Sequence, residues 1–99
     1  MRTIKKMAEH IDEELEGAKE YAEKYVEAKA KGNMNMANKY KEMASDELRH
    51  AGYIHEFAVA EIESVSKVFT PPVEMMEKWE HTHKEFVEKV AWIRQMLAM

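Results

Sequence analysis

The chain has 99 residues, of which 45% are hydrophobic and 34% are charged, and its net charge is -4. One domain of this size buries only about 60–65% of the surface of its unfolded chain, so pairing with a second copy favours stability. The acidic balance excludes a typical nucleic-acid-binding role, and the absence of cysteine excludes disulfides and thiolate metal sites. There is no membrane-spanning apolar run and no signal-peptide core, so we expect a cytoplasmic protein.

The first predicted helix covers about residues 3–31. Apolar residues recur in it every three or four positions, which is the spacing of one helical face. They are Ile4, Met7, Ala8, Ile11, Leu15, Ala18, Ala22, Tyr25 and Val26. Gly32 follows in the position that glycine favours after a helix, and Asn33 or Asn35 is expected to cap the next helix.

The second predicted helix covers about residues 34–69. Its apolar face contains two carboxylates, Glu47 and Glu61, among otherwise mostly apolar residues. The members of this face are Met36, Tyr40, Met43, Ala44, Glu47, Leu48, Ala51, Ile54, His55, Ala58, Glu61, Ile62, Val65 and Phe69. The pair Pro71-Pro72 ends the helix, because proline lacks a backbone donor and restricts the residue before it.

The third predicted helix covers about residues 72–97 and carries a regular seam with 3-4 spacing. The seam contains Met76, Trp79, His83, Phe86, Val90, Ile93 and Leu97. His83 is its single polar member, and Trp92 lies off the seam, where an exposed Trp marks a partner surface. Because the connections are short, we expect an all-α, antiparallel three-helix domain over residues 1–99.

Glu47 and His50 form a Glu-x-x-His pair near the middle of the chain. Residues three apart lie on the same helical face, so both side chains are expected to point into a dry interior. The same pattern recurs at Glu80 and His83, and in a chain so rich in glutamate it also arises by chance. The position of each pair on its helix therefore decides which one is a candidate metal site. Glu47 lies on the predicted buried face, and an unpaired carboxylate there needs a metal, a cation or a proton.

Glu14 is the predicted partner of this pair. If the first two helices fold back around Gly32, Glu14 and His50 lie at the same level, since each is equally far from the turn in sequence. Two carboxylates and an imidazole suit iron, manganese or zinc. Tyr21, two turns along from Glu14, is expected to hydrogen-bond a ligand on another helix.

A second polar layer is predicted nearer the Pro-Pro turn. There Glu61 is expected to accept a hydrogen bond from His83, as a structural pair or a weak second metal site. The other three histidines, His10, His55 and His81, are expected to be partly exposed bystanders, with His10 near the mouth of the site.

The segment from Glu14 to Ala51 resembles the first helical hairpin of the ferritin-like superfamily, and rubrerythrins in particular. The resemblance rests on Glu14, on Tyr21 seven residues later, on Gly32 at the turn, and on Glu47 and His50 followed by Ala51. It implies a four-helix bundle with a di-iron carboxylate site that oxidises Fe(II) with O₂ or peroxide.

The chain departs from that family pattern because it has one hairpin and a single further helix, which give half of a di-iron site. A homodimer would supply the other half, as in the small ferritin-like proteins housed inside encapsulins. Two other functions stay open: a metal-free helical interaction or adaptor protein that uses the third helix, and a structural zinc or manganese site without turnover.

Overall fold

The computed structural model describes residues 2–99 and contains three α-helices. They are α1 (Arg2–Ala30), α2 (Met34–Ser66) and α3 (Val73–Leu97), and no strand occurs among the described residues. The predicted all-α, three-helix fold is confirmed. The helices form a rod with extents of 55 × 17 × 17 Å. Within residues 2–99, no helix has the length and apolar character needed to span a bilayer.

The first turn follows the sequence signals closely. Gly32 adopts a φ of +78°, the left-handed conformation that glycine reaches without strain. Asn33 is the residue that caps α2, because its side-chain oxygen accepts a hydrogen bond from the backbone N–H of Met36 at 3.2 Å. α1 and α2 therefore form an antiparallel hairpin.

The second connection begins earlier than predicted. α2 ends at Ser66 rather than near residue 69, and the backbone N–H groups of Val68 and Phe69 both bond the carbonyl oxygen of Val65. Thr70 and Pro71 each precede a proline and therefore avoid the helical conformation. The helix ends before them, and the chain reverses direction between Ser66 and Val73. Phe69, predicted as part of the buried face, is consequently exposed.

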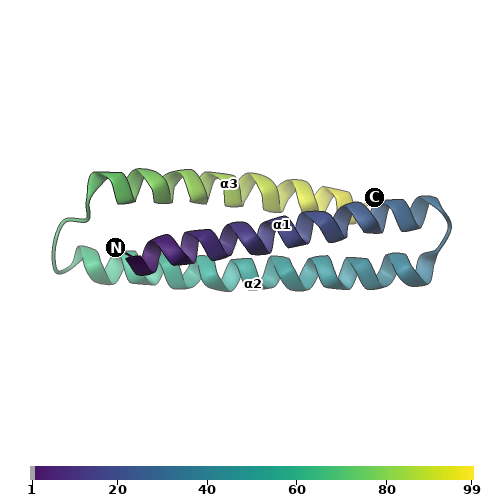
Figure 1. The fold of residues 1–99 in the computed structure, drawn as a ribbon, viewed down its shortest axis with the longest axis horizontal. Helices are drawn as coiled ribbons and strands as arrows, with labels where there is room; N and C mark the ends of the chain where they lie inside the picture. Colours follow the sequence, from purple (N-terminus) through teal and green to yellow (C-terminus); the bar gives the residue numbers. More distant parts are fainter. Residues whose placement is uncertain (1) are drawn as a thin grey trace.

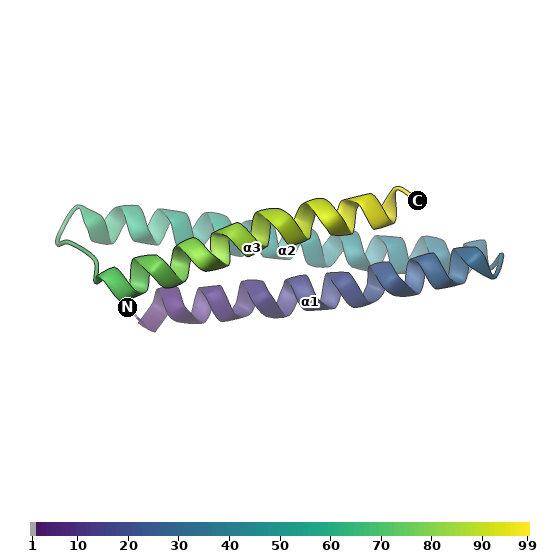
Figure 2. The ribbon, with the colours of Figure 1, turned by 90° about the horizontal axis from the view of Figure 1, so that it is seen from above.

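α1 lies alongside both other helices. Figures 1 and 2 show that α1 and α3 begin at the same end of the rod, while α2 runs in the opposite direction. α3 packs mainly against α1 of its own chain and touches α2 at few places. The α1–α2 hairpin is thus covered by α3 on one side only.

The contact between α1 and α2 is built on alanines spaced seven residues apart in α2. Ala37, Ala44, Ala51 and Ala58 are fully buried. Small side chains on a repeating seam let two helices approach closely, and larger side chains are then pushed to the flanks. The observed buried face of α2 is rotated about the helix axis relative to the predicted one. The prediction placed Met36 and Met43 inside, whereas both are exposed.

The buried core runs along the rod in two clusters. Its largest fully buried side chains are Ile4, Ile11, Leu15 and Ile93. One cluster surrounds Ile11 and Leu15 and includes Trp79; the other surrounds Ala22 and Ile93. Leu15 follows Glu14 directly in the sequence, so the rigid core fixes the backbone that carries the candidate ligand.

The predicted Glu61–His83 pair is wrong. His83 is exposed, and Thr82 occupies the buried position on α3. The Nδ1 atom of His83 lies 2.8 Å from Nε2 of His55, and the His55 ring stacks on Phe86 with centroids 4.3 Å apart. His55 is therefore part of the α2–α3 contact rather than a bystander. Burial, and then the positive charge of His83, lower the pKa of the His55 imidazole.

Candidate metal centre

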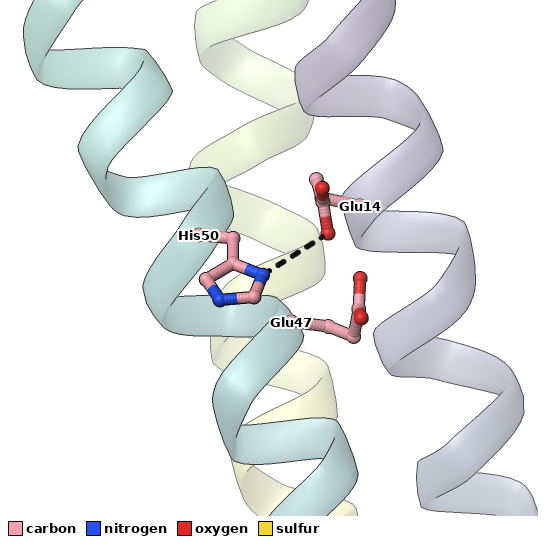
Figure 3. A group of neighbouring side chains, drawn as sticks. All are labelled: Glu14, Glu47 and His50. Carbon is pink, nitrogen blue, oxygen red and sulfur yellow. Dashed lines mark ion pairs between the residues drawn. The ribbon is translucent and has the colours of Figure 1, made fainter.

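Glu14, Glu47 and His50 come together in the middle of the hairpin. Glu14 projects from α1, and Glu47 and His50 project from α2, all toward one point between the helices (Figure 3). One ligand atom from each residue lies within 4.8 Å of the others. The structure thus brings the three predicted ligands into one group, with a carboxylate of one helix level with the Glu-x-x-His pair of the other.

The group opens to solvent on one side. The His50 side chain is 49% exposed and the Glu14 side chain 17%, with 3.7 Å between His50 Nδ1 and Glu14 Oε2. α3 runs behind the two helices, on the side away from the three side chains (Figure 3). The prediction of a dry interior around His50 is therefore wrong. The face that carries His50 is the one that α3 leaves uncovered.

The Glu14 and Glu47 carboxyl groups shift each other's pKa in opposite directions. A hydrogen bond from Glu47 lowers the pKa of Glu14, and the same bond, together with burial and the charge of Glu14, raises the pKa of Glu47. A hydrogen bond between two carboxyl groups requires a proton, and the raised pKa of Glu47 beside the lowered pKa of Glu14 favours Glu47 as the group that carries it. A divalent cation that displaces the proton would leave both groups as charged ligands.

The structure adds two contributors near this group: the sequence analysis placed His10 only at the mouth of the site, and it gave Gly17 no role. His10, one helical turn before Glu14, has its Nε2 atom 3.0 Å from Glu14 Oε1. Gly17, one turn after Glu14, leaves room for Glu47: a β-carbon there would lie 3.3 Å from Glu47 Oε2. The available sequence signals were the four-residue spacing of His10 and Glu14 and a glycine inside a helix, where it costs stability.

The remaining predicted polar residues lie apart from the ligand group. Tyr21 is half-buried and stacks on Tyr40 of α2, with ring centroids 6.3 Å apart. Its predicted role as the hydrogen-bond partner of a ligand is therefore replaced by an aromatic contact that holds α1 to α2. Glu61 is half-buried about three turns beyond His50 and belongs to neither the ligand group nor the His55–His83 contact.

Comparisons with protein-family models, with curated proteins and with solved structures find no match to this chain. The metals that Glu14, Glu47 and His50 could bind are therefore inferred from the chemistry of their donor atoms. Two carboxylates and one imidazole are hard or borderline ligands that fit Fe(II), Mn(II) or Zn(II), and three protein donors leave coordination positions open.

Replacing Gly17 with alanine is expected to weaken metal binding without destabilising the fold. Alanine inside a helix stabilises the protein by about 1 kcal/mol relative to glycine. At Gly17 part of this gain is lost, because the Glu47 carboxylate must shift, and affinity for Zn(II) falls several-fold. Gly52→Ala is the matched control, since a β-carbon there meets no atom within 4 Å. Urea unfolding and calorimetric titration measure both effects, and equal Zn(II) affinity in the two variants would contradict this role of Gly17.

Proposed function

We propose that the chain is a ferritin-like metal-binding protein that holds iron, or manganese, with Glu14, Glu47 and His50. The observation that carries the proposal is the convergence of these ligand atoms from two helices within 4.8 Å. The single hairpin offers one Glu and one Glu-x-x-His pair, which is half of the ligand set of a di-metal carboxylate centre. In our proposal two chains face each other and complete the centre.

The uncovered face of the hairpin supports this pairing. Met43, His50 and Phe57 are spaced seven residues apart on α2, so each lies within about 20° of the next around the helix axis. Met43 is 40% exposed and Phe57 59% exposed. We call these three residues the exposed stripe. Exposed apolar side chains with heptad spacing on either side of His50 favour packing against another helix, and a second copy placed there would bring its own ligands beside the first set.

The chain's residues would hold the metals by simple coordination chemistry. The Glu14 and Glu47 carboxylates would supply negatively charged oxygen ligands, and His50 would supply a neutral nitrogen ligand. Iron held by these residues would supply the redox chemistry for a reaction with O₂ or peroxide. Within one chain, the stacked Tyr21 and Tyr40 and the alanine contacts between α1 and α2 hold Glu14 at the level of Glu47 and His50.

The experiment is metal titration of the purified chain, followed by thermal unfolding and sedimentation. Metal bound only by the folded protein at 100 times its dissociation constant stabilises it by about 2.7 kcal/mol, which raises the melting temperature by roughly 10–20 °C for a domain of this size. We expect this shift with Mn(II) and with Fe(II) under argon, and two ions per dimer. An unchanged melting temperature with each metal would instead support a metal-free interaction protein.

A redox test separates iron handling from a structural metal site. The Fe(II)-loaded chain is mixed with O₂ or peroxide, and Fe(III) formation is followed by absorbance. Oxidation faster than that of free Fe(II) in the same buffer is expected. Stabilisation by Zn(II) without any acceleration of Fe(II) oxidation would favour a structural site without turnover.

A further inference from the structure

The two oxygens of the Glu14 carboxylate face two different imidazoles. Oε1 lies 3.0 Å from Nε2 of His10 on the same helix, and Oε2 lies 3.7 Å from Nδ1 of His50 on α2. The His10 contact has the length and atoms of a hydrogen bond, whereas the His50 contact is longer than one. Glu14 is thus held at one oxygen and directed with the other toward the remaining ligands.

α3 contains a pair with the same spacing and no ligand group beside it. Nε2 of His81 lies 3.2 Å from Oε1 of Glu85, again four residues apart on one helix. The Glu85 side chain is 36% exposed and belongs to no metal-ligating group of the described residues, whereas Glu14 is 17% exposed and belongs to one. A histidine and a glutamate four residues apart on a helix can therefore form a contact at any surface position. The His10–Glu14 contact differs because Glu14 lies beside Glu47 and His50.

We propose that His10 is a positioning residue of the metal centre, an inference that rests on the function proposed above. Its Nε2–H group donates a hydrogen bond to Glu14 Oε1, which fixes the rotation of the carboxylate about its last bond. Oε2 then remains directed at the position shared with Glu47 and His50. A carboxylate without this partner must lose rotational freedom when it binds a metal, and such outer hydrogen bonds are worth about 10–100-fold in metal affinity.

The test compares three variants of the full chain by calorimetric titration with Zn(II). His10→Ala is expected to bind Zn(II) about 10–100-fold more weakly than the unsubstituted chain. His10→Gln keeps an N–H donor in a similar place and is expected to recover most of this loss. His81→Ala removes the matched pair on α3 and is expected to leave affinity unchanged. The melting temperatures of the metal-free variants are expected to stay together, because both histidines are exposed.

Nitrogen NMR of the histidine rings gives the second readout. In the Zn(II)-loaded chain, a His50 ring nitrogen is expected to show the shift of a metal-bound imidazole, while His10 Nε2 stays protonated. A metal-bound nitrogen on His10 would overturn the positioning role and make His10 a ligand. Equal losses in His10→Ala and His10→Gln would overturn the hydrogen-bond explanation.

The failures of the two proposals are distinguishable. Zn(II) affinity that is equal in His10→Ala and in the unsubstituted chain would overturn the positioning role alone and leave the metal centre standing. Failure of the unsubstituted chain to bind Zn(II), Mn(II) or Fe(II) would overturn the metal centre, and the role of His10 with it.

Discussion

Replacing Glu47 with glutamine is expected to lower the proposed affinity of the chain for Mn(II) and Fe(II) by at least about 100-fold, because a lost ligand costs more than a lost outer hydrogen bond. Glutamine has the shape of a protonated glutamate and can still donate a hydrogen bond to Glu14. The helices and the metal-free site are therefore preserved, while one of the charged ligands is gone. Calorimetric titration measures the loss, and unchanged affinity would remove Glu47 from the centre.

The same substitution is expected to stabilise the metal-free protein at neutral pH. The hydrogen bond to Glu14, burial and the charge of Glu14 raise the pKa of Glu47 in the folded state above its ordinary value of 4.5. A group with a raised pKa favours folding below pH 4.5, and this contribution is lost as the pH rises through the folded-state pKa. Glu47→Gln should thus exceed the unsubstituted chain in stability at pH 7.5, and the difference should vanish near pH 4.

Glu56→Gln is the control for this pH effect. Glu56 lies on α2 with an exposed side chain outside the ligand group. Urea unfolding of both variants at pH 4 and pH 7.5 gives the comparison. A Glu47→Gln protein that is less stable than the unsubstituted chain at pH 7.5 would contradict the raised pKa of Glu47 in the folded state.

Replacing Phe57 with glutamate is expected to dissociate the proposed dimer. In a twofold dimer each copy carries the change, so a loss of about 2 kcal/mol per copy becomes about 4 kcal/mol, or roughly 1000-fold in dissociation constant. Phe57 is 59% exposed in the single chain, so the fold itself loses little. Val87→Glu is the control, because Val87 is similarly exposed but lies on α3, away from the exposed stripe.

Sedimentation equilibrium of the metal-loaded proteins measures this effect. We expect the unsubstituted chain and Val87→Glu to sediment as dimers and Phe57→Glu as a monomer with weakened metal binding. A Phe57→Glu protein that stays dimeric would place the interface elsewhere, for example on α3 around the exposed Trp92. Tight metal binding by a Phe57→Glu monomer would show that one hairpin is sufficient for the site.

The sequence by itself determined how far along the rod each ligand lies. A helix rises by a fixed distance per residue, so Gly32 and the Asn33 cap set the level of Glu14 against His50 once the hairpin forms. The Pro-Pro pair likewise determined that a third helix begins shortly after residue 70. These features depend on backbone geometry, which glycine, asparagine and proline report directly.

Only the tertiary structure decided which way each side chain faces around its helix. That rotation depends on which side chains fit between two helices, and here the buried alanines of α2 fit better than the larger methionines. The choice turned His50 to an open face, moved His83 away from Glu61, and brought His10 and Gly17 to the ligand group. The rise per residue along a helix is fixed by the backbone of that helix alone. The face that a helix buries depends on how its side chains pack against those of the neighbouring helix.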